Sequence, residues 1–293
     1  MTQISQMVTH ARPDFAALRE AGLMPVDMHT HTLHSDAPIR VRDALRKAED
    51  RGFGLAITDH NGVGGVLEAR RLGTRAMVVP GIEVSAWDGP HILIYFYDIH
   101  DLEDFYENHI RDALSKNPYL ATRLMTEEVL ERAAGYSCVV SAAHPYGYLL
   151  FNKGVQKCID REYLNPAALS EFDAVEALCG GMGRGQNEKA AALARDRGLG
   201  VTGGTDGHLL SDLGNVVTCA DAADVGGFLD AVARRETRIV GLEKNTLEKC
   251  TTAVGVLPQY LPYLGPSLAV HWHQNLPRLL RIPSRLKTGL KHP

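Results

Sequence analysis

The chain has 293 residues, of which 45% are hydrophobic and 23% charged, a composition typical of folded globular proteins and not of disordered chains. Its 31 basic and 35 acidic side chains give a net charge of −4, so the overall charge does not indicate a nucleic-acid-binding protein. The N-terminus has no apolar signal core and the five cysteines form no CxxC pair, so we expect a cytoplasmic protein with reduced thiols.

Short apolar runs alternate with helical patterns along most of the chain. The runs with strand character cover residues 25–31, 54–60, 76–86, 91–98, 137–144, 174–180 and 198–208. The helical patterns cover residues 38–52, 65–73, 102–135, 187–198 and 221–236. Strands that alternate with helices predict parallel βα units. Seven such strands favour a closed or nearly closed α/β barrel, although the spacing also permits an open sheet.

The pattern divides the chain into three parts. Residues 1–24 precede the alternation as an N-terminal extension, and residues 25–248 carry it as the barrel domain. Residues 249–293 form a C-terminal extension that is rich in proline, free of acidic residues and without clear periodicity. The six Lys and Arg residues of this extension leave a charge of −10 on residues 1–248. Its prolines argue against a membrane-spanning helix.

The first strand contains two histidines, His29 and His31, separated by one residue. Residues i and i+2 of a strand share a face, so both rings aim at one point, as two ligands of one metal ion do. Further polar residues lie at or just beyond C-terminal strand ends, where parallel barrels place their active sites. These residues are Asp59, His60, Glu83, His144, Asp206 and His208. His91 departs from this rule because it opens the fourth strand.

Imidazole and carboxylate groups make up this set of side chains. Such ligands suit Zn, Mn or Fe and not a calcium site, whose ligands are mostly oxygens. There are about nine candidate ligands, more than the four that one structural zinc takes. The sequence therefore predicts two or three divalent transition-metal ions.

Five motifs of the chain resemble those of the PHP (polymerase and histidinol phosphatase) family of metal-dependent phosphoesterases. They are DMHTHTLHSD, AITDHN, PGIEVSA, AAHP and GGTDGH, and the resemblance covers about residues 25–220. It implies a distorted (β/α)7 barrel with the active site at the C-terminal ends of the strands, in agreement with the seven strands counted above. It also implies a cluster of two or three metal ions.

The resemblance assigns the candidate ligands to individual metals. The first metal would be held by His29, His31, Glu83 and Asp206. Glu83 would bridge to a second metal, which His91 and His144 also hold. A third metal would take Asp36, His60 and His208. Asp27 and Asp59 are interpreted as supports of the ligands, with Asp27 orienting a histidine through its free ring nitrogen. His34 is interpreted as a loop residue.

The implied reaction is phosphoester hydrolysis by a hydroxide that bridges two metals. Asp206 could accept a proton from the nucleophile, and His208 or His60 could contact the substrate and donate a proton to the leaving oxygen. Arg184, in the glycine-rich run CGGMGRGQN, is a candidate phosphate ligand, with an exposed loop arginine as the alternative. Asn187 is expected to cap the helix that follows.

The substrate is less well determined than the reaction. The segment at about residues 100–136 is acidic, which disfavours a long polyanion. We therefore expect a small phosphomonoester, with a nucleotide phosphatase or a 5′-3′ exonuclease on nucleic-acid ends as the alternative. A further alternative is a non-catalytic binding protein whose basic C-terminal extension contacts a membrane surface or a partner. The extension could instead wrap the barrel or cover its open end.

Overall fold

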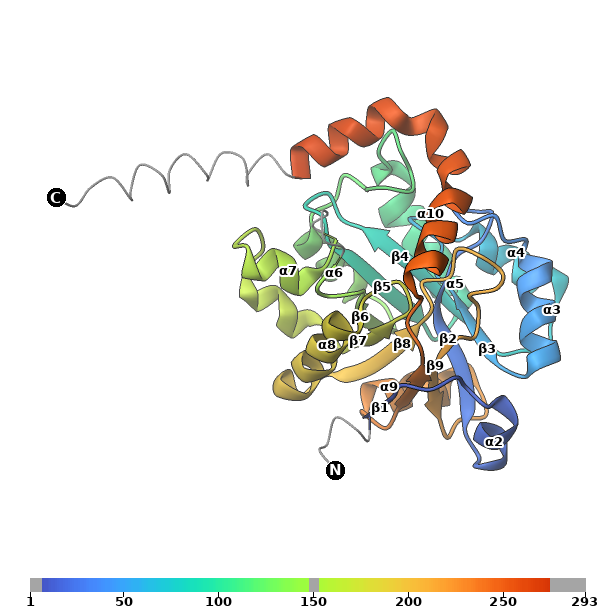
Figure 1. The fold of residues 1–293 in the computed structure, drawn as a ribbon. Coiled ribbons are helices and arrows are strands. Elements are labelled where there is room, and N and C mark those ends of the chain that lie inside the picture. Colours follow the sequence, from blue (N-terminus) through green and yellow to red (C-terminus); the bar gives the residue numbers. More distant parts are fainter. Residues whose placement is uncertain (1–6, 148–152, 275–293) are drawn as a thin grey trace.

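The structure is a computed structural model, and it describes residues 7–147 and 153–274. Ten strands form one curled sheet in the order β1-β10-β9-β2-β3-β4-β5-β6-β7-β8, with helices around it (Figure 1). The strands are β1 (Val8–Thr9), β2 (Met24–Thr30), β3 (Gly54–Ile57), β4 (Val78–Ser85), β5 (His91–Phe96), β6 (Cys138–Ala142), β7 (Ala174–Cys179), β8 (Gly200–Gly204), β9 (Val216–Ala220) and β10 (Arg238–Gly241). All seven predicted strands are present, as β2 to β8.

The sheet closes into a distorted barrel next to the end of β2. The first half of β2 pairs with β9, whereas Thr30 at its end forms an isolated parallel bridge with Gly207, just beyond β8. The backbone N–H of Gly207 donates to the carbonyl of His29 at 3.2 Å, and the N–H of His31 donates to the carbonyl of Gly207 at 3.1 Å. This contact brings the two ends of the strand series together, as the barrel prediction requires.

The strands are not all parallel, which corrects the expected series of parallel βα units. β5 runs antiparallel to both β4 and β6, and Ser85 pairs with His91. Only residues 86–90 connect β4 to β5, and a parallel crossover needs a dozen or more residues. The start of β5 therefore lies beside the C-terminal ends of the parallel strands. This reversal explains why His91, at the start of its strand, still belongs with the other candidate ligands.

Three short strands were missed by the sequence analysis. β9 and β10 flank the expected helix at 221–236 and pair antiparallel with each other, and β1 adds to the edge of β10. β1 has two residues and β10 has four, too few for a period-2 pattern to stand out from their surroundings.

Within the described residues, the helices labelled α2 to α10 lie around the sheet, and a further helix covers residues 264–274. The labelled helices are α2 (Phe15–Glu20), α3 (Val41–Arg51), α4 (Gly64–Leu72), α5 (Ile99–Phe105), α6 (Thr126–Ala133), α7 (Val155–Asp160), α8 (Arg184–Arg197), α9 (Val225–Ala233) and α10 (Thr246–Tyr260). The expected glycine stops are confirmed at Gly52 and Gly198, which end α3 and α8 with φ values of +77° and +63°. Within the described residues, no helix combines the length and the hydrophobicity needed to cross a bilayer.

Asn187 does not cap α8, because that helix begins three residues earlier, after Gly183. The Asn187 side chain instead accepts a hydrogen bond from the backbone N–H of Cys179 and donates one to its carbonyl, each at 3.1 Å. It thereby ties α8 to the end of β7. The sequence pattern suggested a cap because the preceding glycines resemble a loop.

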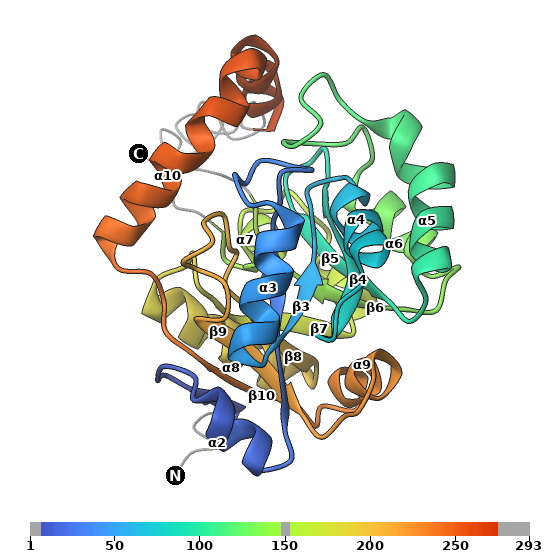
Figure 2. The same cartoon turned by 90° about the vertical axis from the view of Figure 1, so that its right-hand side faces the viewer.

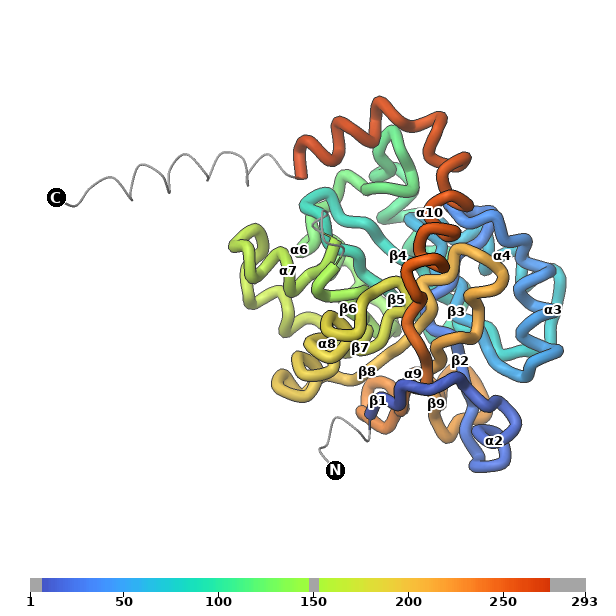
Figure 3. Tube along the Cα trace, in the orientation of Figure 1, coloured from blue at the N-terminus to red at the C-terminus, as the bar shows by residue number. Residues whose placement is uncertain are grey.

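The described part of the C-terminal extension is helical, contrary to the irregular segment that we expected. α10 is followed by a 3-10 turn (Leu261–Tyr263) and by a helix over residues 264–274. Its prolines lie within or between these helices and bend the path without ending it (Figure 3). Figures 1 and 2 show α10 at the open end of the barrel, while α9 lies near the opposite end. The described part of the extension thus covers the barrel, one of the alternatives left open by the sequence.

Candidate metal centre

Glu83, on β4, lies at the centre of a group of buried histidines. Its carboxylate oxygens are within 3.5 Å of a ring nitrogen from each of five histidines: His29 (3.4 Å), His31 (3.5 Å), His60 (2.8 Å), His91 (2.9 Å) and His144 (3.1 Å). All five rings and Glu83 are buried. Burial alone would raise the pKa of Glu83, but the neighbouring imidazoles, led by His60 and His91, outweigh burial and hold it well below its usual range.

Two aspartates complete the cluster. Oδ1 of Asp206 lies 3.3 Å from Nε2 of His31 and 3.7 Å from Nε2 of His29. Oδ1 of Asp36 lies 3.3 Å from Nε2 of His208, and its Oδ2 lies 3.7 Å from Nε2 of His60. The structure therefore brings together all nine residues that were predicted to bind metal.

These side chains form three overlapping groups in which the ligand atoms lie within 4.8 Å of one another. The groups are His29, His31 and Asp206; His60, Glu83 and His91; and His31, Asp36, His60 and His208. The first and third groups resemble the expected first and third metal sites, with His31 shared between them. His144 contacts Glu83 from the side of the second group.

The chemistry of the cluster fits divalent transition metals. Among the described residues, the buried Nε2 atoms of His29 and His31 and the Oε2 atom of Glu83 make no hydrogen bond of good geometry, although Nδ1 of His60 lies 2.8 Å from this oxygen and Oδ1 of Asp206 lies 3.3 Å from Nε2 of His31. Leaving buried polar atoms unsatisfied costs about 1–3 kcal/mol each, so groups that converge in this way need another partner. Burial, together with the nearby His208 and His60, lowers the pKa of His31 to about 3, which keeps this imidazole neutral. Neutral imidazoles and carboxylates are the ligands that Zn, Mn and Fe share.

Backbone turns with positive φ direct two of these side chains into the mouth of the barrel. His144 follows β6 with φ +26°, and Asp206 follows β8 with φ +48°. A non-glycine residue in this left-handed region costs roughly 1–2 kcal/mol, and such residues gather at functional sites. The strain therefore falls on two of the candidate ligands.

Glu176, in the middle of β7, supports the cluster and was missed by the sequence analysis. Its Oε1 lies 2.9 Å from Nδ1 of His29, and its Oε2 accepts the backbone N–H of His144 at 2.7 Å. A carboxylate in this position orients a ligand histidine and raises its basicity. The available signal was a single acid within an otherwise apolar strand, AVEALC.

Asp27 and Asp59 act on the backbone and the loops around the ligands. Asp27 was expected to orient a histidine ring, but it accepts the backbone N–H groups of Thr205 (2.9 Å) and Gly214 (2.9 Å), so that expectation is wrong. Its carboxylate fixes the turn that leads into Asp206. Asp59 accepts hydrogen bonds from the N–H of Thr32 (2.7 Å) and the hydroxyl of Ser35 (2.8 Å), and so fixes the loop that carries Asp36.

His34 and Arg184 lie outside the cluster. His34 pairs with Glu68 at 2.6 Å, in keeping with its interpretation as a loop residue. Arg184 forms a bidentate ion pair with Glu243, with N–O distances of 2.6 and 2.8 Å. It is not among the described residues that line the adjoining cavity. A phosphate contact by Arg184 stays a prediction, and it would require this ion pair to open.

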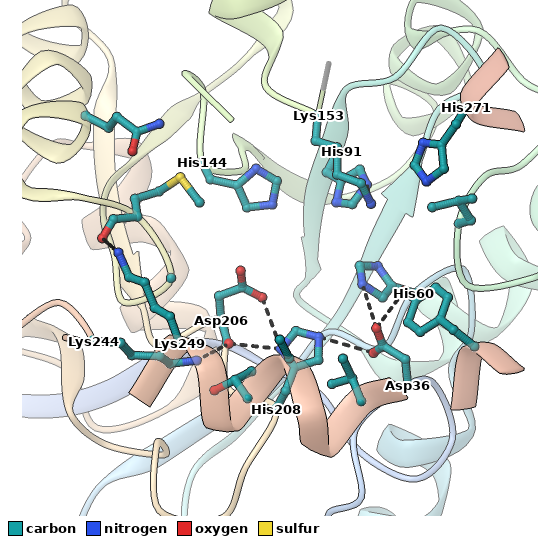
Figure 4. Close-up of a pocket in the computed structure, with 18 residues that line it drawn as sticks. Asp36, His60, His91, His144, Lys153, Asp206, His208, Lys244, Lys249 and His271 are labelled. Carbon is teal, nitrogen blue, oxygen red and sulfur yellow. Dashed lines mark hydrogen bonds and ion pairs between the residues drawn. The ribbon is translucent and has the colours of Figure 1, made fainter. Parts of the chain in front are cut away.

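A cavity of about 570 Å³ lies between the cluster and the C-terminal helices (Figure 4). The cluster residues on its wall are Asp36, His60, His91, His144, Asp206 and His208. The opposite wall comes largely from α10, through Thr252, Ala253, Val256 and Tyr260. The hydroxyl of Tyr260 donates to Oδ2 of Asp36 at 2.8 Å, so the covering helix contacts the cluster directly.

Three lysines also reach this cavity, and the sequence analysis had singled out none of them for the site (Figure 4). Nζ of the half-buried Lys153 lies 3.2 Å from Nε2 of His91. Lys244 pairs with Asp212 at 2.9 Å and donates to the carbonyl of Asp206 at 2.9 Å. Lys249, in the first turns of α10, donates to the carbonyl of Met182 at 3.0 Å. No short motif links these lysines to the ligands, because only the folded chain brings them to the same cavity.

Comparisons with known proteins agree with this architecture. Residues 184–237, which include α8 and α9, match the model of the family described as PHP-associated. A search of the curated proteins finds no match to this sequence.

Several solved structures share the fold. A protein from Bifidobacterium adolescentis assigned to the metal-dependent phosphoesterases has a TM-score of 0.50 and 20% identity, over 76% of this chain and 97% of its own. A two-domain protein from Bacteroides vulgatus with a predicted PHP-like metal-dependent phosphoesterase has a TM-score of 0.53 and 15% identity, over 83% and 70%. The lesion-specific endonuclease from Pyrococcus furiosus has a TM-score of 0.60 and 14% identity, over 82% and 71%. The TM-scores of 0.50 to 0.60 indicate a common fold, and at identities of 20% or less the likeness shows the fold alone.

Proposed function

We propose that this chain, which has the fold of the PHP-like metal-dependent phosphoesterases, hydrolyses a small phosphomonoester. The observation that carries the proposal is the convergence of five histidines on the buried carboxylate of Glu83, next to a cavity that contains lysines. A purely structural metal site needs four ligands and no cavity. The nine candidate ligands beside an open space are better explained by catalysis than by a non-catalytic binding barrel.

The metal ions would be held by the three overlapping groups around Glu83, Asp206 and Asp36. Zn, Mn or Fe ions in such a cluster supply Lewis acidity, which polarises a phosphate ester and lowers the pKa of water. Glu176 keeps the ring of His29 in place, and Asp59 keeps the loop of Asp36 in place. These supports hold the ligand atoms within the short distances that a metal cluster requires.

The remaining side chains of the cavity have roles of their own in this proposal. Lys153 and Lys249 compensate the negative charge of the phosphate, which is where phosphoryl transfer gains most of its rate. Asp206 accepts a proton from the nucleophile at a carboxylate oxygen. His60 and His208 both line the cavity and contact the substrate, and whichever of the two is not committed to a metal passes one proton from a ring nitrogen to the leaving oxygen.

The size of the cavity supports a small substrate. Its volume of about 570 Å³ lies in the usual range for small-molecule pockets, roughly 300–1,000 Å³. α10 contributes one wall, so a nucleic-acid duplex would have to displace this helix to reach Glu83. A nuclease or nucleotide phosphatase is the second candidate, because the lesion-specific endonuclease from Pyrococcus furiosus has the same fold.

The test combines metal analysis with a substrate panel. The panel contains small phosphomonoesters, nucleoside monophosphates, single-stranded DNA and a duplex with an abasic site. For the wild type we expect bound Zn, Mn or Fe and hydrolysis of one or more small monoesters. Glu83→Gln, which keeps the shape of the side chain and removes its charge, should lose metal and at least about a thousandfold in kcat/KM.

Glu127→Gln, an exposed substitution on α6, is the matched control and should retain both properties. Cleavage of the DNA substrates alone would favour the second candidate. A wild-type protein without bound metal or hydrolytic activity, or full activity in Glu83→Gln, would contradict the proposal.

A further inference from the structure

Asp36, a candidate ligand of the third metal, is carried by a loop and not by a strand. The loop covers residues 31–40, between β2 and α3. Figure 4 shows the Asp36 carboxylate beside His60 and His208, the two histidines of its group that line the cavity. Both neighbours are themselves candidate ligands. The carboxylate therefore needs a contact from outside the group to keep one orientation.

The hydroxyl of Tyr260, the last residue of α10, supplies this contact. It donates a hydrogen bond to Oδ2 of Asp36 at 2.8 Å. A phenol carries its proton at neutral pH, whereas an ionised carboxylate only accepts, so the direction of this bond is fixed. Among the described residues, the buried Oδ1 atom of Asp36 makes no hydrogen bond of good geometry and lies 3.3 Å from Nε2 of His208. The tyrosine thus occupies one carboxylate oxygen and leaves the other for a cation.

Contacts at both ends of α10 hold the helix on the barrel. In its first turns, Nζ of Lys249 donates to the carbonyl of Met182 at 3.0 Å. At its last residue, the Tyr260 ring packs edge-on against the ring of Tyr119, with the centroids 6.5 Å apart. Neither contact involves a candidate ligand. The hydroxyl is therefore placed by the helix and the barrel together, and it acts as a fixed support for the carboxylate.

We propose that Tyr260 is the positioning residue of the third metal site, and that it couples this metal to the docking of α10 on the barrel. Without the hydroxyl, Oδ2 of Asp36 loses its contact outside the group, and the carboxylate is free to turn away from His208. Coupling between two binding events is reciprocal, so a metal that needs the docked helix also stabilises it. This inference rests on the metal centre of the proposed function and does not depend on the substrate.

The test is metal binding by the full-length protein. Dialysis against buffers of graded free Zn, followed by elemental analysis, gives the number of ions bound per chain at each concentration. For the wild type we expect three ions, one for each group of ligands. In Tyr260→Phe the dissociation constant of one ion should rise about 10–100-fold, the usual loss for a group that supports a ligand. The other two ions should bind as before, because their groups do not include Asp36.

Hydrogen exchange of the α10 backbone amides gives a second readout. In the wild type, exchange should slow as the third ion binds, because ion and helix stabilise each other. In Tyr260→Phe the helix keeps the ring that packs on Tyr119, but its exchange should no longer respond to the third ion. A tyrosine that only packs the helix would not link these two measurements.

Tyr263→Phe is the matched control. The Tyr263 ring lies 5.6 Å from that of Tyr119, in the turn after α10, so this variant removes a hydroxyl beside the same ring and leaves the bond to Asp36 in place. It should bind three ions with wild-type constants. Asp36→Ala removes the acceptor instead of the donor, and adding Tyr260→Phe to it should weaken metal binding no further.

The outcomes separate this inference from the proposed function. Wild-type binding of three ions by Tyr260→Phe, an equal loss of all three, or a further loss in the double variant would overturn the inference alone. So would a wild type that saturates at two ions. A wild type that binds no metal would overturn the metal centre, and with it the proposed function.

Discussion

Glu176 connects two parts of the cluster through one buried carboxylate. Its contact with Nδ1 of His29 favours the tautomer in which Nδ1 carries the proton, and so leaves Nε2 available to a metal. Its second oxygen holds the backbone of His144, a residue with positive φ. Glu176 therefore stabilises the orientation of two candidate ligands.

Replacing Glu176 by Gln should weaken metal binding without unfolding the protein. The amide has one donor and one acceptor end, so it cannot accept hydrogen bonds from both the His29 ring and the His144 backbone. We expect the metal affinity to fall by about 10–100-fold, as for other carboxylates that support a ligand histidine. Competition with a chromophoric chelator measures this change. Glu171→Gln, on the exposed side of the turn before β7, is the control, and equal affinities would contradict the prediction.

Single residues of the cluster differ in how far the sequence reveals them. The nine candidate ligands could be predicted because each lies at or near a strand end or in a motif. Glu176 has no such position, since it lies within a strand. Lys153, Lys249 and Tyr260 reach the cavity from segments whose course depends on tertiary packing, and local patterns do not encode that course.

The closure of the barrel depends on a close approach of β8 to β2. A Cβ on Gly204, the last residue of β8, would lie 2.4 Å from both the backbone nitrogen and the Cβ of His29. A gap this small accepts only glycine, because backbone atoms cannot rotate away. The same contact fixes the position of the first candidate ligand.

Gly204→Ala should therefore separate β8 from β2. We expect a loss of at least about 2 kcal/mol in the free energy of unfolding, together with weaker metal binding because His29 moves. Urea denaturation followed by circular dichroism measures the first effect. Gly185→Ala is the matched control, since a Cβ there meets no atom within 4 Å and Gly185 lies in α8, where alanine is tolerated. If both variants unfold at the same urea concentration, the close approach is not what closes the barrel.

The direction of β5 and the helix α10 were not predicted, each for a physical reason. The direction of β5 could have been inferred from the four residues between the runs at 76–86 and 91–98, which are too few for a crossover. α10 begins with a capping box, in which Asn245 and Glu248 exchange hydrogen bonds. Despite this signal the helix was not predicted, because of its prolines and its outward-facing leucines. A helix whose apolar face is turned away from its own domain does not produce the pattern of a core helix.

The cluster couples the folding of the whole chain to the binding of metal. Its residues come from segments spread between His29 and His208, so they meet only when the barrel is closed. Each metal that binds across these segments therefore favours the folded chain over the unfolded one. The buried carboxylates and the unsatisfied ring nitrogens make the metal-free fold less stable for the same reason.

Removing the metal should consequently lower the unfolding temperature. A ligand at about a hundred times its dissociation constant stabilises the fold by about 2.7 kcal/mol, which corresponds to roughly 5 °C or more for a domain of this size. Dialysis against a chelator followed by calorimetry should show this decrease, and adding Zn or Mn should reverse it. Glu83→Gln provides the control, because its unfolding temperature should no longer respond to chelator or metal. An unchanged temperature for the wild-type protein after its metal has been removed would mean that the cluster does not couple metal binding to the stability of the barrel.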